Sequence, residues 1–179
     1  QSRIPRLVDK AIADGMKGMA ITDHGVMFGI KELCDYCAKV NKGRKKEGLE
    51  PFKPIIGCEM YVAHRRKEDR EKDKGDMSGY HLIVLAKNYN GYKNLIKLVS
   101  NSWVDGYYMR PRTDRNELEK YHEGLIVCSA CLGGELPQAI MHGNIDEAHR
   151  VVEEFKSIFG EDYYLELQLH PSGNARIDA

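Results

Sequence analysis

Apolar and polar residues alternate along the chain with two different periods, one typical of helices and one typical of strands. Residues 4–13 and 145–159 repeat apolar side chains at helical spacing, which predicts amphipathic helices. Shorter apolar runs without that spacing predict buried strands. We expect helices at 4–13, 29–45, 92–103 and 145–159, and strands at 18–21, 53–63, 81–86, 124–129 and 163–167.

Helices separate most of these predicted strands. Strands joined by helical crossovers favour a mostly parallel sheet, either open and doubly wound or closed into a barrel. No internal repeat and no linker rich in proline or serine divides the sequence, so we expect a single α/β domain over residues 1–179. The charged run at 65–76 contains no apolar residue and is interpreted as a solvated loop or hairpin arm, with a DNA-contacting arm as the alternative.

The amino-acid composition excludes some classes of function for this protein. The 27 Lys and Arg residues cancel the 27 Asp and Glu residues, so the surface as a whole is not built to hold nucleic acid, although a local basic patch is allowed. One such patch is the run of Tyr107, Tyr108, Arg110 and Arg112, interpreted as a surface loop with stacking on a single strand as the alternative. No apolar run is long enough to cross a bilayer, which excludes membrane insertion.

Residues able to bind a metal or move a proton lie near the predicted strands. Asp23 and His24 follow the first strand, although Asp23 is equally suited to capping the next helix. Glu59 lies in a strand expected to be buried, and a lone buried carboxylate is costly unless a cation or hydrogen-bond donors satisfy it. His81 opens the third strand, where an ordinary core or edge histidine is the alternative.

Cysteines supply further candidate ligands. Cys131 and His170 follow the fourth and fifth strands, and the resulting mixture of imidazole, carboxylate and thiolate suits Zn, Mn or Fe. The pairs Cys34/Cys37 and Cys128/Cys131 raise the alternative of a zinc ribbon, which is disfavoured because the first pair falls inside a predicted helix. The odd total of five cysteines and the lack of an N-terminal targeting pattern indicate reduced thiols in the cytoplasm.

Five motifs occur in the order seen in one family. The motifs are Thr22–Gly25, the strand at 56–61, the strand at 81–88, the turn at 128–135 and the run at 164–170. Together they make the sequence resemble the PHP (polymerase and histidinol phosphatase) domain at the N-terminus of bacterial replicative DNA polymerases, the alpha subunits of DNA polymerase III. The resemblance covers essentially the whole chain.

The resemblance implies a distorted (β/α)7 PHP-type barrel whose strand ends hold two or three divalent metal ions. It assigns metal ligation to His24, Glu59, His81 and Cys131, and adds Asp23 as an orienting carboxylate, so that Asp23 and Glu59 are the candidate catalytic groups. The implied activity is that of a metal-dependent phosphoesterase, in the form of a 3′→5′ proofreading exonuclease. The implied partners are DNA, as primer-template or single strand, and the other replicase subunits.

The resemblance also sets expectations for what the sequence leaves out. The family's opening His-x-His and closing Asp-x-His motifs are not in these residues, so we expect the first and last barrel strands to be missing. We also expect incomplete metal binding and no activity from these residues alone, with DNA-directed DNA synthesis carried by the whole subunit. Two alternatives stay open, namely a structural module that binds partner subunits without chemistry and a stand-alone phosphatase of small phosphate esters.

Overall fold

The computed structural model describes residues 3–72 and 78–168. The helices in these ranges are α1 (Ile4–Ala13), α2 (Ile30–Lys46), α3 (Tyr89–Val104), α4 (Arg115–Lys120), α5 (Glu135–Met141), α6 (Ile145–Phe159) and the short 3-10 helix η2 (Gly160–Asp162). The strands are β1 (Gly18–Ile21), β2 (Lys53–Val62), β3 (Tyr80–Ala86), β4 (Arg112–Thr113), β5 (Leu125–Cys128) and β6 (Tyr163–Tyr164). No helix within the described residues is long and apolar enough to cross a membrane.

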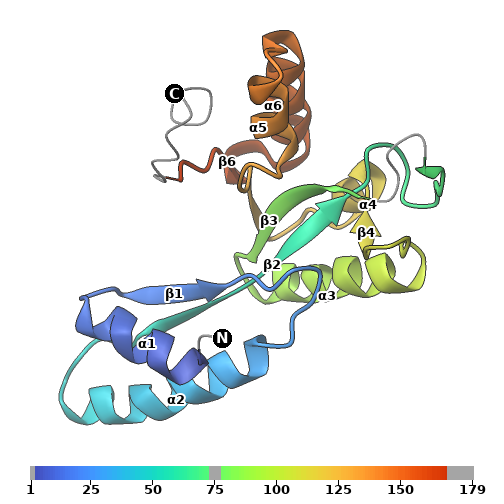
Figure 1. Ribbon diagram of the computed structural model, residues 1–179. Coiled ribbons are helices and arrows are strands. Elements are labelled where there is room, and N and C mark those ends of the chain that lie inside the picture. The colour runs from blue at the N-terminus through green and yellow to red at the C-terminus, as the bar shows by residue number, and fades with distance from the viewer. Residues whose placement is uncertain (1–2, 73–77, 169–179) are drawn as a thin grey trace.

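The strands form one mixed sheet around the long strand β2 (Figure 1). One edge of β2 is paired first with β1 and then, further along, with β4, and both pairings are parallel. The other edge is paired with β3, and β3 is antiparallel to both of its neighbours, β2 and β5. Across the described residues three of the five pairings are parallel and the sheet does not close, because β1 and β6 lie at its two ends.

The antiparallel direction of β3 has a simple cause. The described residues between β2 and β3, 63–72 and 78–79, contain no α-helix that could act as a crossover, and β3 returns beside β2 instead of crossing the sheet. The start of β3 therefore lies next to the end of β2, with His81 opposite Tyr61. The reversal of direction places His81, near the start of β3, beside the end of β2.

Two clusters of buried side chains lie along the sheet. The smaller cluster joins α1 and α2 to β1 and to the start of β2, and includes Val8, Leu33 and Phe52. The larger cluster joins β2, β3 and β5 to α3, α5 and α6, and its centre includes Val84 and Leu98. Figure 1 shows α1 and α2 at one end of β2, and α5 and α6 beyond the other end of the sheet. The loop that leaves β1 lies between these two parts of the molecule.

Each predicted helix and strand is present in the structure, with differences at some boundaries, and several short elements were not predicted. The helix expected at 92–103 begins earlier, because Asn88 accepts a hydrogen bond from the Gly91 backbone and caps α3. The strand expected at 163–167 was too long, since β6 ends at Tyr164 and the Glu166 backbone N–H donates to Ser129 Oγ instead of extending the ladder. The strand expected at 124–129 is the shorter β5, and no element was predicted at β4, α4, α5 or η2.

The charged run is attached to the body of the domain. Arg112 is fully buried and donates hydrogen bonds to the backbone oxygens of Gly106, Lys67 and Asp69. The buried ammonium of Lys67 lies 3.6 Å from Glu117. The interpretation of 65–76 as a solvated loop or hairpin arm therefore fails at Lys67, whereas the other described residues of the run are exposed or half-buried as expected. Residues 73–76 lie outside the described residues.

Candidate metal centre

The backbone brings the loop after β1 against the middle of β2. The backbone N–H of Glu59 donates to the backbone carbonyl oxygen of Asp23 at 3.0 Å. The backbone N–H of Gly25 donates to the backbone carbonyl oxygen of Glu59 at 2.9 Å. These two bonds continue the β1–β2 pairing by one isolated bridge between His24 and Glu59. The two side chains are thereby fixed on the same side of the sheet, next to each other.

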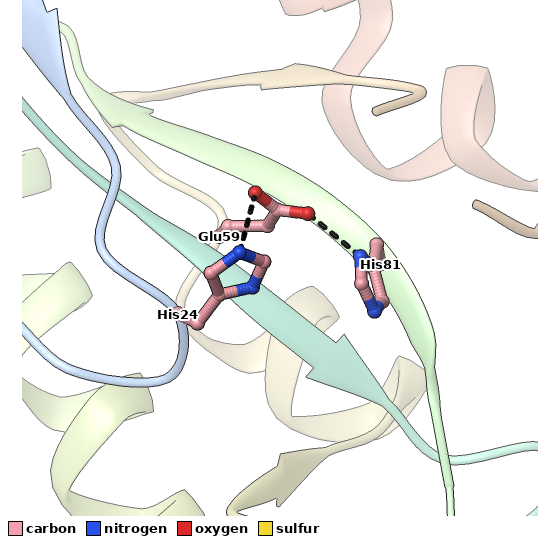
Figure 2. Close-up of side chains that lie close together, drawn as sticks. All are labelled: His24, Glu59 and His81. Carbon is pink, nitrogen blue, oxygen red and sulfur yellow. Dashed lines mark hydrogen bonds and ion pairs between the residues drawn. The ribbon is translucent and has the colours of Figure 1, made fainter. Parts of the chain in front are cut away.

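Glu59 lies between two histidines (Figure 2). Its Oε1 is 2.7 Å from Nδ1 of His81, and its Oε2 is 3.7 Å from Nε2 of His24. The Glu59 side chain is 14% exposed, that of His81 27% and that of His24 58%, so the carboxylate is the most enclosed of the three. One ligand atom from each residue lies within 4.8 Å of the others, which is close enough for a single ion.

Cys131 approaches the same group from the turn after β5. Its Sγ is 3.5 Å from His81 Nδ1 and 3.8 Å from Glu59 Oε1, and it accepts a hydrogen bond from the Gly133 backbone. The backbone N–H of His81 donates to the backbone carbonyl oxygen of Gly133 at 2.9 Å, and this bond holds the turn against the start of β3. Imidazole nitrogens, a carboxylate and a thiol thus converge, and this donor set fits a divalent transition metal.

Asp23 is directed elsewhere. Its Oδ2 accepts a hydrogen bond of 2.9 Å from the Gly29 backbone, just before α2. Its backbone oxygen also accepts a bond from the Cys58 thiol, and burial raises the pKa of Cys58 to about 12, so that the thiol stays protonated. Asp23 therefore orders the loop that carries His24, and the orienting role expected for its carboxylate stays a prediction.

Three further cysteines that the sequence offered as candidates are not part of this group. Cys34 and Cys37 lie on α2, and burial raises the pKa of both thiols. Cys128 lies within β5, where burial again raises the pKa of the thiol. Among the described residues, none of these three cysteines belongs to a group whose ligand atoms lie close enough together to hold one ion, so the zinc-ribbon alternative has no support. His170 lies outside the described residues.

Three residues that the sequence did not single out as site residues support the centre. Tyr61 is two positions after Glu59 and therefore on the same face of β2, and its Oη lies 3.5 Å from His24 Nδ1. Arg110 donates to Tyr61 Oη at 3.1 Å. Trp103 Nε1 donates to the Gly25 oxygen at 2.7 Å and so holds the loop of His24 from the side of α3. The two-residue spacing from Glu59 was the one available signal for Tyr61.

Known proteins resemble this chain in sequence. The sequence profile of the PHP domain matches residues 1–170. The chain is 45% identical over 169 residues to the DNA polymerase III subunit alpha of Borreliella burgdorferi, and 40% identical over 170 residues to that of Treponema pallidum. Each alignment covers 94% of this chain and 14% of the relative, so the chain spans only a small part of these proteins.

A solved structure overlaps the chain loosely. It is a Bifidobacterium adolescentis protein described as a metal-dependent phosphoesterase, and it is 13% identical to this chain. The overlap covers 72% of this chain and 61% of the other, with a TM-score of 0.37, which is too low to support an argument. The family assignment rests on the sequence profile and on the relatives. The chain belongs to the PHP domain family.

Proposed function

We propose that this chain is the PHP domain of the alpha subunit of a bacterial replicative DNA polymerase, and that its metal centre hydrolyses phosphodiesters as a 3′→5′ exonuclease does. The relatives support the first part, because they are named DNA polymerase III subunit alpha. The donor set around Glu59 supports the second part, because clustered divalent ions are a common means of cleaving phosphodiesters.

The observation that carries the proposal is the position of Glu59 between His24 and His81. A carboxylate that is 14% exposed needs donors or a cation, and each of its oxygens faces one imidazole. A divalent cation held by His24, Glu59, His81 and Cys131 would supply an activated water and would neutralise charge on the leaving oxygen. Mn, Zn and Fe all suit these ligands.

The chain's own residues have separable tasks in this proposal. Glu59 holds the centre together because its two oxygens reach two histidines that come from different elements. Tyr61 supports the His24 ring through Nδ1 and leaves Nε2 directed at Glu59. Asp23 orients the loop, and its carboxylate is the second candidate catalytic group.

The wider setting is part of the same proposal. We infer that the open sheet belongs to a distorted (β/α)7 barrel, since both ends of the described sheet are unpaired edges within the described residues. DNA is the proposed substrate, the other replicase subunits are the proposed partners and the cytoplasm is the proposed location. DNA-directed DNA synthesis belongs to the remaining length that the relatives have and this chain does not span.

Hydrolysis with substrates of two kinds tests the activity. The whole alpha subunit, loaded with Mn or Zn, is assayed with bis-p-nitrophenyl phosphate, p-nitrophenyl phosphate and single-stranded DNA labelled at its 5′ end. We expect metal-dependent cleavage of the diester and stepwise shortening of the DNA from its 3′ end. Glu59→Gln removes both activities, whereas Glu161→Gln, a matched change in the short helix η2, leaves them intact.

The other functions give different results in the same assay. Hydrolysis of the monoester alone would contradict the exonuclease proposal and would favour the phosphatase. No hydrolysis of any substrate by metal-loaded protein would contradict catalysis and would favour a structural module. Cleavage that survives Glu59→Gln would show that the activity arises at a different site.

A further inference from the structure

A pair of exposed aromatic side chains lies at the C-terminal end of α3. The rings of Trp103 and Tyr107 are stacked, with their centroids 5.4 Å apart and their planes inclined by 19°. Each residue keeps 47% of its surface exposed, although both carry large aromatic rings. Exposed aromatic rings in a group are uncommon on a protein surface without a binding role.

This aromatic pair is joined directly to the metal centre. Trp103 Nε1 donates to the Gly25 oxygen at 2.7 Å, and Gly25 follows the proposed ligand His24. Gly25 has a φ of +65°, and Pro111 lies so close that a Cβ at this position would be 2.7 Å from its ring. The loop of His24 is therefore clamped between Trp103 and the segment that follows Tyr107.

An arginine completes the surface between the aromatic pair and the metal centre. Arg110 is exposed, donates to Tyr61 Oη at 3.1 Å and lies over the Tyr61 ring. Among the described residues no carboxylate forms an ion pair with Arg110, in contrast to Arg115, which pairs with Glu135 and Glu154. Its guanidinium is thus a positive charge beside the centre that is available to an anion.

The neighbouring residues of the same loop have a different role. Tyr108 and Arg112 were grouped with Tyr107 and Arg110 in the sequence, but Arg112 is fully buried and lies over the Tyr108 ring. The structure therefore divides the run into an inward pair that holds the loop and an outward pair that faces solvent. Tyr107 and Arg110 are exposed and can contact a ligand, whereas Tyr108 is half-buried and Arg112 is buried.

We propose that Trp103, Tyr107 and Arg110 form a platform for the end of a single-stranded nucleic acid. A base stacks on the aromatic pair, and the adjoining phosphate binds Arg110, which places the sugar-phosphate backbone beside Glu59. Aromatic rings bind bases of any sequence, and a guanidinium binds phosphate, so this combination fits a single strand better than a small phosphate ester. The inference rests on the proposed function and adds the residues that bind its substrate.

Trp103 itself reports on the platform in protein limited to these 179 residues, because it is the only tryptophan in the sequence. Its fluorescence is titrated with a short oligothymidylate in the presence of a chelator, so that neither metal binding nor hydrolysis contributes. An abasic deoxyribose-phosphate oligomer of equal length supplies the phosphates without the bases. We expect saturable quenching by oligothymidylate, and weaker binding with little quenching for the abasic oligomer.

Matched variants separate stacking from charge. Tyr107→Ala is compared with Tyr89→Ala, another exposed tyrosine, which lies at the far end of α3, about 20 Å along the helix from Trp103. We expect about 10-fold weaker binding for Tyr107→Ala and no change for Tyr89→Ala. We expect Arg110→Gln to reduce the slope of log affinity against log salt concentration by about one released counterion. Arg110→Lys keeps most of the wild-type slope, and Lys93→Gln leaves it unchanged.

The outcomes that overturn the platform are specific. Equal quenching by the abasic oligomer would exclude base stacking, and unchanged affinity in folded Tyr107→Ala would exclude this surface. Circular dichroism and the midpoint of urea unfolding establish that each variant is folded. Hydrolysis is measured separately, so an active enzyme with no quenching refutes the platform alone, and quenching without hydrolysis in metal-loaded protein refutes the exonuclease alone.

Discussion

Replacing Gly133 with alanine tests whether the His81 ring belongs to the metal centre. A Cβ added at Gly133 would lie 3.0 Å from both Cγ and Nδ1 of His81, so the ring must move by a few tenths of an ångström. The same Nδ1 is 2.7 Å from Glu59 Oε1 and 3.5 Å from Cys131 Sγ. Metal–ligand distances tolerate changes of only about 0.2 Å, so the displacement is large on the scale of the site.

We expect Gly133→Ala to bind Zn or Mn about 10- to 100-fold more weakly, as substitutions that misplace metal ligands do. The assay is competition with a chromophoric chelator on folded protein. Gly43→Ala is the matched control, because Gly43 lies within α2 with open space around it. The control keeps its metal affinity and gains about 0.5–1 kcal/mol of unfolding free energy. Unchanged metal affinity in Gly133→Ala would refute the role of His81 as a ligand.

Three further predictions concern stability. Arg112→Met removes a buried guanidinium from three backbone oxygens, and we expect it to lower the free energy of unfolding by roughly 3 kcal/mol in urea and to speed amide exchange at 65–72. Tyr163 has a buried hydroxyl without a hydrogen-bond partner among the described residues, so Tyr163→Phe is expected to raise unfolding free energy by about 1 kcal/mol. Burial raises the pKa of Tyr163 to about 12, above the value of about 10 for an unfolded chain. The free energy of unfolding of the wild-type protein is therefore expected to fall as pH rises from about 10 to 12. Urea unfolding measured at each pH should show a smaller fall for Tyr163→Phe.

The parts of the fold that were predictable have strong local signals. α1 and α6 have apolar stripes along their whole length, and both match their expected bounds. β4 has no such signal, because its two residues become a strand only through pairing with Tyr61 and Val62. α4 did have a signal that was missed, since Asp114 caps the helix by accepting from the Glu117 backbone.

The candidate site was predictable to the extent that its residues carry distinctive chemistry. His24, Glu59, His81 and Cys131 each stand beside an apolar run, and the structure brings them together. Arg110 could not be found in the same way, because it meets Tyr61 only through the folding of a loop that is 49 residues away in sequence. Because β3 is antiparallel to β2, His81 at the start of β3 lies beside the C-terminal half of β2, which carries Glu59.

The most direct test of the metal centre is the position of a bound ion. Crystals of the protein grown with Zn are measured above and below the zinc absorption edge, and the anomalous difference map is calculated. We expect a peak about 2.0–2.3 Å from ligand atoms of His24, Glu59 and His81, with Cys131 beside it. A peak at Cys34 and Cys37 instead, or density for zinc only at surface histidines such as His142, would contradict the account.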